Sequence, residues 1–422
     1  MAFKGTRTVN SLCFEKERPA LDRVDAAAMS IIEEESRPEP DTEKLAALRA
    51  GLEAAEQAAD KLAVKDEYWK IYTELGESGM NAMTSTDYTA YVVSLPSNRL
   101  EAWMVLESDR FMNPVLREFY RERDVVMEER LMGESDPNRL LWETLSTTAF
   151  STHPYHNPII GWEEDLRRLT RGDAEKFYET FYAPNNAVLS VVGDVEPAEV
   201  IRLAEKYFSP WKSRPLPDRD YPTEPPQTSE KRVEVRFGAK PALRIGFHNP
   251  GYSGKDAYAL IMLSEILSGG KSSRFYRGIV EGRELALYAN SYSSFPGDRY
   301  PSLFVVMAAP KAPHTLEEVE AAVLEELDRL KTDPPSLREM EKVLNGYEAD
   351  LVGQLESGAG LGMSLAVGQQ IHGDWRFDWK TADELRRLEP ADISRAAGKY
   401  FTRENRTVVF LRESGHGPRA AI

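Results

Sequence analysis

Short apolar runs and longer segments with helical spacing alternate along this chain of 422 residues. Residues 188–192, 303–307 and 407–411 are short, apolar and rich in β-branched side chains, so we expect buried strands there. Residues 81–95 are rich in Thr, Tyr and Val and predict a longer strand. None of these runs approaches the roughly 20 apolar residues that a membrane-spanning helix needs.

Six other segments carry apolar residues at helical spacing, and each is expected to form a helix. They are residues 100–112, 116–132, 174–182, 257–267, 316–330 and 337–355. Ser336 and Glu339 have the spacing of a capping box at the start of the last of these helices. This mixture of strands and helices predicts an α+β protein in which helices pack on one face of an antiparallel sheet.

A heptad pattern distinguishes residues from about 15 to 65, where apolar side chains recur at alternating intervals of three and four. The first run consists of Leu21, Val24, Ala28 and Ile31, and the second of Leu45, Leu48, Leu52, Ala55, Ala59 and Leu62. Pro38 and Pro40 separate the runs, and Asp41 can cap the second. We therefore expect an antiparallel helical hairpin whose stripes bury against one another and which carries no chemistry.

The chain also contains an internal duplication. Phe181-Tyr-Ala-Pro-Asn-Asn186 precedes one apolar run and Tyr400-Phe-Thr-Arg-Glu-Asn405 precedes another, at an offset of 219 residues (405 − 186). Between the two halves, prolines crowd residues 210–226 and predict an extended linker. The expected organisation is a first domain at residues 1–209 that includes the hairpin, a linker at residues 210–230, and a homologous second domain at residues 231–422.

Composition limits the chemistry that is open to the chain. The formal net charge of −16 argues against a protein held to nucleic acid by phosphate neutralisation. Cys13 is the single cysteine, so any zinc would need His and Glu ligands. The first residues lack the apolar stretch of a secretory signal. We expect a soluble protein, cytoplasmic as written and periplasmic if an upstream signal peptide exists.

One predicted helix carries a pair of carboxylates on a partly apolar stripe. Glu122 and Glu129 are seven residues apart, which brings them to nearly the same helical face, with Val125 and Val126 between them. Taken alone, the pattern fits a charged, solvated helix. It also fits a metal carboxylate with a second carboxylate behind it, provided that a pair of histidines completes the site.

Several short motifs follow one another in order along the chain. They are residues 1–6, 81–91, 122–129, 153–161 and 182–186 in the first half, and residues 272–276 with 285–288 in the second. In this order and spacing they resemble the pitrilysin/insulinase family of zinc peptidases, especially the mitochondrial processing peptidase and its bacterial relatives. Residues 1–6 resemble the sequence that follows the family's inverted zinc motif, H-x-x-E-H. The resemblance implies two homologous domains, of which the second is non-catalytic.

The resemblance also implies the chemistry. In the family, two histidines one helical turn apart bind one Zn2+, a Glu between them activates water, and a distant Glu completes the site. By resemblance, Glu129 is the distant ligand and Glu122 is a supporting carboxylate. Both histidines and the general base are missing from the chain as written, and its six histidines form no such pattern. The matching segment of the second half, residues 262–266, keeps Glu265 without either histidine.

Two explanations for the missing motif remain open. Either the start codon was assigned too late, at an internal Met, or the gene is truncated. The first explanation fits better with a first domain that folds, because a domain without the preceding segment would lack strands and leave a large apolar face exposed.

A binding mode for peptides follows from the same resemblance. Two subunits, or one fused chain, close around the substrate, so we expect a homodimer or a heterodimer with a family subunit. An extended peptide would add to the strand near Asn81 and Thr84, unless this strand lies inside the sheet. In relatives an Arg and a Tyr of the second domain also hold the substrate. Tyr288 matches the Tyr, whereas Glu281 stands at the expected Arg position and Arg283 lies two residues further on.

The sequence therefore predicts a zinc-dependent metalloendopeptidase that cleaves peptides or unfolded segments and is inactive as written. Two alternatives remain: a non-catalytic partner subunit of a family heterodimer, and an unrelated scaffold whose hairpin mediates association. Neither a nucleic-acid partner nor a membrane span is expected.

Overall fold

A computed structural model describes residues 3–252 and 254–414. The chain divides into two compact units whose segments interleave along the sequence. Unit 1 comprises Met1–Met83, Thr89–Arg130 and Ile160–Arg219, and unit 2 comprises Thr84–Tyr88, Leu131–Ile159 and Asp220–Ile422. The division into domains at residues 210–230 stays a prediction.

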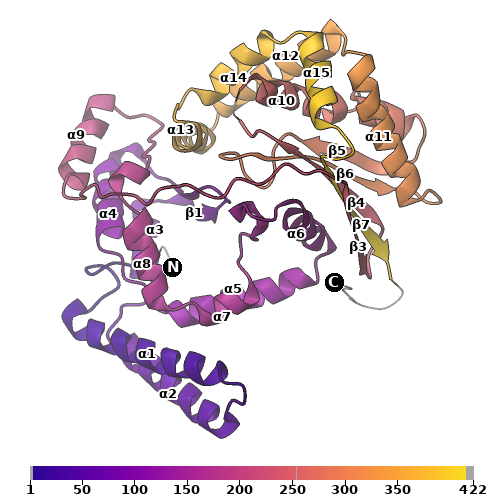
Figure 1. Ribbon diagram of the computed structural model, residues 1–422. Coiled ribbons are helices and arrows are strands. Elements are labelled where there is room, and N and C mark those ends of the chain that lie inside the picture. The colour runs from indigo at the N-terminus through magenta and orange to yellow at the C-terminus, as the bar shows by residue number, and fades with distance from the viewer. Residues whose placement is uncertain (1–2, 253, 415–422) are drawn as a thin grey trace. The chain divides into compact units, whose positions relative to one another are not determined.

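The predicted helical hairpin is present in unit 1. Helices α1 (Phe14–Glu35) and α2 (Thr42–Asp60) pack along each other (Figure 1). Asp41 caps α2, because its carboxylate accepts hydrogen bonds from the backbone N–H groups of Glu43 and Lys44, both at 3.0 Å. Heptad residues of both helices share one apolar cluster with the first residues of α5 (Phe119–Glu134): Leu21, Val24, Ala28 and Ala59 with Phe119 and Tyr120.

Unit 1 is otherwise mainly helical. Its remaining helices are α3 (Glu67–Leu75), α4 (Leu100–Met112), α7 (Glu163–Arg168), α8 (Arg171–Phe181), α9 (Pro197–Phe208) and the part of α5 up to Arg130, with 3-10 turns η1 (Ser97–Arg99) and η3 (Pro184–Asn186). Strands β1 (Ser78–Thr84) and β2 (Thr89–Ser94) form a two-stranded sheet. The helices predicted at 100–112, 116–132 and 174–182 are confirmed, and no boundary differs by more than three residues.

A buried carboxylate organises the interior of unit 1. Glu107 of α4 accepts hydrogen bonds from the hydroxyls of Tyr68 at 2.8 Å and Tyr72 at 2.5 Å, both on α3. It also pairs with Arg110, whose guanidinium lies 4.2 Å from the ring centre of Tyr91 on β2. Because each polar group has a partner, these side chains connect α3, α4 and β2 without leaving a buried charge unpaired.

Two strand predictions for the first half are wrong. Residues 81–95 do not form one long strand, because a turn at residues 85–88 separates β1 from β2. Residues 188–192 form no strand, and Val188 and Leu189 are 37% and 46% exposed instead of buried. An apolar run keeps strand geometry where neighbouring strands satisfy its backbone hydrogen bonds. Within the part of the chain that the structure describes, no strand pairs with these residues.

Unit 2 contains a five-stranded sheet with the order β3-β7-β4-β6-β5. The strands are β3 (Lys231–Phe237), β4 (Ala242–Asn249), β5 (Ala286–Tyr292), β6 (Ser302–Pro310) and β7 (Arg406–Glu413). The predicted buried strands at 303–307 and 407–411 lie within β6 and β7 and are confirmed. The sheet is mixed rather than purely antiparallel, because β3 runs parallel to β7 while the other pairs are antiparallel.

Helices cover both faces of this sheet (Figure 1). α10 (Lys255–Ser268), α11 (Leu316–Thr332) and α15 (Pro390–Tyr400) pack on one face, with α12 (Leu337–Gln354), α13 (Gly358–His372) and α14 (Phe377–Arg386) stacked beyond them. α6 (Pro137–Ala149) packs on the opposite face, so the expectation of helices on one face holds only in part. Short turns complete the unit: η2 (Pro154–His156) and the π-helix η4 (Tyr276–Glu281).

Local signals explain where helices of unit 2 begin. Ser336 accepts a hydrogen bond from the Glu339 backbone N–H, and the Glu339 carboxylate accepts one from the Ser336 N–H, which confirms the predicted capping box. The helices predicted at 257–267, 316–330 and 337–355 are likewise confirmed as α10, α11 and α12. Across the described residues, no helix combines the length and apolar character needed to cross a bilayer.

Candidate functional site

α5 carries both carboxylates that were predicted to serve a metal. Phe119 and Tyr120 at its start are buried against the helical hairpin and fix the helix in place. Two turns along one face separate Glu122, which is half-buried, from Glu129, which is exposed. Val125 lies between them and is 58% exposed. The described residues therefore leave this face of α5 largely uncovered.

Lys4 interacts with the first of these carboxylates. Its ammonium lies 3.0 Å from Oε1 of Glu122 and also contacts Glu118. Burial works to lower the pKa of Lys4, but hydrogen bonds to Glu118 and Glu122 outweigh burial and raise this pKa above its ordinary value. Lys4 consequently offsets part of the negative charge at the start of α5.

A second ion pair anchors the same N-terminal segment. Arg117, just before α5, pairs with Glu17 of α1, with Nε 2.5 Å from Oε1, and both side chains are buried. Arg117 also donates hydrogen bonds to the backbone carbonyls of Lys4 at 3.0 Å and Thr6 at 2.8 Å. The segment that leads to Glu122 is therefore held by both backbone and side-chain contacts.

The described residues do not make a zinc site on their own. Within residues 3–252 and 254–414, no three His, Cys, Asp or Glu side chains lie close enough together to hold a metal ion. Glu129 supplies one carboxylate, whereas zinc in proteins takes three or four protein donors. The donors that the described residues supply by themselves therefore do not fit zinc.

The two residues predicted on a substrate-binding strand lie on β1. Asn81 and Thr84 are both exposed. The Asn81 side-chain carbonyl accepts a hydrogen bond from the next backbone N–H, at 2.9 Å. β1 pairs with β2 on one side, and no other described strand pairs with it. β1 is thus an edge strand, and the alternative in which it lies inside a larger sheet does not apply to the described residues.

The two residues of the second half that were predicted to bind substrate contact different partners. Arg283 donates a hydrogen bond to the Gly278 carbonyl at 3.0 Å and pairs with Glu325 of α11 at 2.7 Å. Tyr288 is half-buried on β5 and interacts with Arg244 of β4. Each side chain therefore has its own partners within unit 2, and the described contacts do not join Arg283 to Tyr288.

Three of the histidines lie beside aromatic rings of unit 2: His153, which is buried, and His248 and His372, which are half-buried. His153 accepts a hydrogen bond from the Tyr155 N–H at 3.2 Å, and the ring of His372 stacks on Phe377 with 3.5 Å between centroids. Burial lowers the pKa of His153, of His248 and of His372, the last to about 4. His416 lies outside the described residues.

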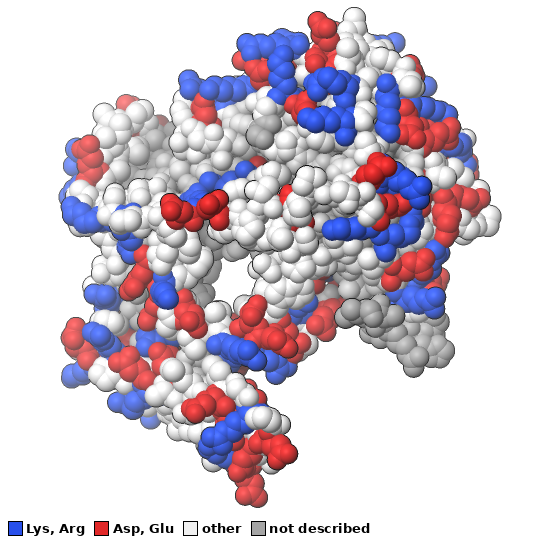
Figure 2. Space-filling model, viewed as in Figure 1, with Lys and Arg blue, Asp and Glu red and all other residues white. Residues whose placement is uncertain are grey.

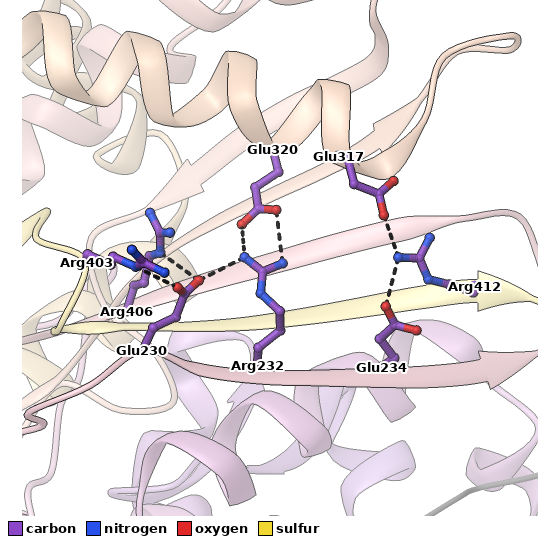
Figure 3. Close-up of polar contacts among 8 residues, drawn as sticks. All are labelled: Glu230, Arg232, Glu234, Glu317, Glu320, Arg403, Arg406 and Arg412. Atoms are coloured by element: carbon purple, nitrogen blue, oxygen red, sulfur yellow. Dashed lines mark hydrogen bonds and ion pairs between the residues drawn. The ribbon is translucent and has the colours of Figure 1, made fainter.

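A row of ion pairs follows the β3 edge of the five-stranded sheet (Figure 3). Arg232 lies between Glu230, at 2.8 Å, and Glu320 of α11, at 2.5 Å. Burial works to raise the pKa of Glu230, but hydrogen bonds from Arg406, Arg232 and Arg403 outweigh it and lower the pKa to about 2. Further along, Arg412 bridges Glu234 and Glu317. Charged side chains on an edge strand oppose pairing with another strand, so we assign this row a structural role.

Charge on the surface drawn in Figure 2 is mixed. Acidic and basic side chains are interspersed there, without one continuous field of a single sign. The net charge of −16 therefore produces no broad acidic region on this face. Specific pairs, rather than a general attraction for cations, dominate its electrostatics.

Comparison with known proteins decides the family. Zinc protease PqqE of Helicobacter pylori is 30% identical over 358 residues, covering 82% of this chain and 79% of that protein. The chain belongs to the peptidase M16 (insulinase) family. Within the M16 family, the description "Insulinase (Peptidase family M16)" matches residues 61–163 and "Peptidase M16 inactive domain" matches residues 168–347. The uncharacterized zinc protease YmxG of Bacillus subtilis is 24% identical, over 80% of this chain and 82% of that protein.

Solved structures agree with the M16 assignment. A protease from Helicobacter pylori superposes with a TM-score of 0.75 at 29% identity, covering 82% of this chain and 84% of that chain. A peptidase M16 inactive domain from Pseudomonas fluorescens gives a TM-score of 0.68 at 18% identity, over 84% of this chain and 83% of that chain, and supports the fold alone. The predicted family and the α+β class are confirmed.

Sequence reasoning missed Arg244. Its side chain is 1% exposed on β4, on the face that α6 covers. A signal was present, because Ala242-Leu-Arg-Ile-Gly-Phe247 contains a single charge inside an apolar run. A charge in such a run is unfavourable unless it has a partner or a ligand.

Proposed function

We propose that this M16 chain forms part of a zinc-dependent endopeptidase in which Glu129 is a metal ligand and Glu122 supports the site. The two histidines and the general base would come from an H-x-x-E-H segment, which the 422 residues do not contain. Zinc held in this way would polarise a peptide carbonyl and activate water. The substrates would be peptides or unfolded segments. Two relatives that carry the name zinc protease support this activity.

The open face of α5 is the observation that carries the proposal. Glu122 and Glu129 stand two turns apart on it, beside the exposed Val125. An exposed apolar residue between two carboxylates suits a face that packs against another helix and shares a polar site with it. A helix with H-x-x-E-H presents both imidazoles on one side, as this arrangement requires.

The internal duplication supports the existence of such a covering segment. Residues 187–192 correspond to residues 406–411 of β7 at the offset of 219, and β7 lies between β3 and β4. β4 leads into α10, where Glu265 occupies the place of the family's catalytic Glu. By analogy, two strands would pair with residues 187–192, and a helix would cover α5. The partial exposure of Val188 and Leu189 is consistent with this role.

Substrate binding is proposed to begin at the open edge of β1. An extended peptide would align along this strand near Asn81 and Thr84 and form main-chain hydrogen bonds that tolerate many sequences. Tyr288 and Arg283 are proposed as further substrate contacts. The enclosed binding mode of the family also requires a second subunit, either a copy of this chain or a related one.

The proposal is tested on the protein extended in frame through the DNA upstream of Met1. If the extension encodes H-x-x-E-H, the protein should cleave quenched fluorescent peptides. Glu129→Gln should lower kcat/KM by more than about 100-fold, because loss of a ligand exceeds the roughly 10- to 100-fold effect of losing an outer-sphere partner. Glu128→Gln, at the adjacent exposed position, is the matched control and should keep most of the activity. Undiminished cleavage by Glu129→Gln would remove Glu129 from the site.

A non-catalytic partner subunit is the second candidate function. It is favoured by the match of residues 168–347 to an inactive domain. In that case the in-frame extension carries no motif, and the chain should raise the activity of a separate M16 peptidase when the two are produced together.

A further inference from the structure

Arg244 is a buried cation for which the described residues supply no carboxylate within ion-pair distance. Two other buried arginines differ, since Arg110 pairs with Glu107 and Arg117 pairs with Glu17. A buried charge without an opposite charge is strongly unfavourable, and proteins normally avoid it. The position therefore points to a negatively charged group that Arg244 meets when a ligand is bound.

The guanidinium of Arg244 has one hydrogen-bond donor that its contacts do not use. Nη2 donates to the Asn138 side-chain carbonyl at 2.6 Å, and Nη1 donates to the Leu243 backbone carbonyl at 3.0 Å. The Trp142 ring centre lies 4.9 Å from the guanidinium carbon. Nε is buried and has no hydrogen-bond partner. Burial pushes the pKa of Arg244 below its usual range, but a guanidinium keeps its proton at neutral pH.

The register of the sheet shows which residues of the edge strand β5 lie on the same face as Arg244. Arg244 on β4 is opposite Met307 on β6, which is opposite Asn290 on β5, so the three side chains share the face that α6 covers. Tyr288 and Tyr292 flank Asn290 on that face. Tyr288 interacts with the guanidinium.

On this face, the described sheet ends at the outer edge of β5. β5 is the last strand of the described sheet, and Tyr292 near its end is 47% exposed. Trp142 contacts both Tyr292 and Phe295, with ring centroids 6.2 Å and 4.4 Å apart. The guanidinium therefore lies against Trp142, whose ring contacts the partly exposed Tyr292 at the sheet edge.

We propose that Arg244, together with Tyr288, binds the carboxylate of a peptide that docks at the β5 edge. A guanidinium and a phenol hydroxyl both donate hydrogen bonds to a carboxylate, and the aromatic surroundings strengthen the ion pair by excluding water. One cation balances one negative charge, whereas a phosphate dianion would leave excess charge in this apolar setting. The carboxylate belongs either to the peptide C-terminus or to an acidic side chain. The peptide as its carrier rests on the proposed function, but the carboxylate site does not.

Calorimetric titration of the 422-residue protein distinguishes the two sources. Three acetylated pentapeptides are compared: a neutral one with an amidated C-terminus, the same sequence with a free C-terminal carboxylate, and an amidated version with one internal Glu. At least one carboxylate peptide should bind roughly tenfold or more tightly than the neutral peptide. The peptide that gains affinity identifies the source.

Variants test whether Arg244 is responsible. Arg244→Met should abolish the preference for carboxylate. Arg412→Met removes an arginine that pairs with Glu234 and Glu317 elsewhere on the sheet, and it should leave the preference unchanged. Equal affinity for all three peptides, absence of binding, or a preference that survives Arg244→Met would each overturn the proposal.

Two further measurements distinguish a binding role of Arg244 from a purely structural one. Arg244→Met should keep or raise the Tm, because exchanging a buried charge for an apolar side chain of similar volume is often neutral or stabilising. Tyr288→Phe removes one hydroxyl and should weaken carboxylate binding several-fold while the fold is retained. If Arg244→Met does not fold, an unchanged carboxylate preference in Tyr288→Phe contradicts the proposal. None of these measurements needs zinc, so their failure is separate from failure of the peptidase assignment.

Discussion

At the scale of single residues, the buried arginines Arg110 and Arg117 differ from Arg244 in their partners. Arg110 and Arg117 each meet a buried carboxylate, and Arg117 also donates to two backbone carbonyls, which compensates their desolvation. Arg244 has neutral acceptors and an aromatic ring. Arg110 and Arg117 connect elements of unit 1 and need no ligand, whereas Arg244 has the features of a binding residue.

His372 makes the stability of unit 2 depend on pH. Burial and the nearby Arg299 lower its pKa from 6.5 to about 4 in the folded protein. Between these values the unfolded chain binds more protons than the folded one, so the free energy of unfolding falls as the pH drops from about 6.5 to about 4. Above 6.5 the ring is neutral in both states and contributes no slope.

His372→Gln should therefore reduce this pH dependence, as measured by urea unfolding at a series of pH values, while His153 and His248 keep their own contributions. His314→Gln, outside the stack that His372 forms with Phe377, controls for the loss of a histidine as such. A slope between pH 6.5 and 4 that is unchanged in His372→Gln would contradict the assignment.

At the scale of elements, equivalent segments of the two halves differ in whether they pair with other strands. Residues 407–411 lie in β7, an interior strand of a five-stranded sheet, whereas their counterparts at 188–192 pair with no described strand. In the 422-residue protein we expect the amides of residues 188–192 to exchange with deuterium at least about 100-fold faster than those of 407–411, because local opening there breaks no ladder.

Mass spectrometry of peptides from the exchanged protein measures this difference. The extended protein with H-x-x-E-H should protect residues 188–192 to nearly the same degree as 407–411. Strong protection of 188–192 in the 422-residue protein would contradict the account, since it would mean that these residues already have strand partners.

The helices that were predicted are confirmed for reasons that the strands do not share. A helix closes its own hydrogen bonds, so the apolar spacing of residues 316–330 and the capping box at Ser336 were sufficient. A strand depends on neighbours, so the same apolar pattern gave β7 in unit 2 and no strand at 188–192. The turn at 85–88 was missed because β-branched propensity does not mark where a long strand divides.

At the scale of the whole molecule, the order of motifs along the chain was sufficient to predict the M16 family. The same motifs pointed to Glu122 and Glu129, which α5 carries on one face, and their role stays a prediction. Arg244 was not predicted, because its significance depends on which residues surround β4, and α6 comes from a distant part of the chain. Spatial neighbours of this kind cannot be read from local sequence patterns.

The central claim is that Glu129 binds zinc, and the most direct test is the metal content of the extended protein. After dialysis against metal-free buffer, the extended protein and Glu128→Gln should each retain about one zinc per chain, the stoichiometry of a single catalytic site. Glu129→Gln should lose most of it under the same conditions. Retention of the full zinc content by Glu129→Gln would contradict the account.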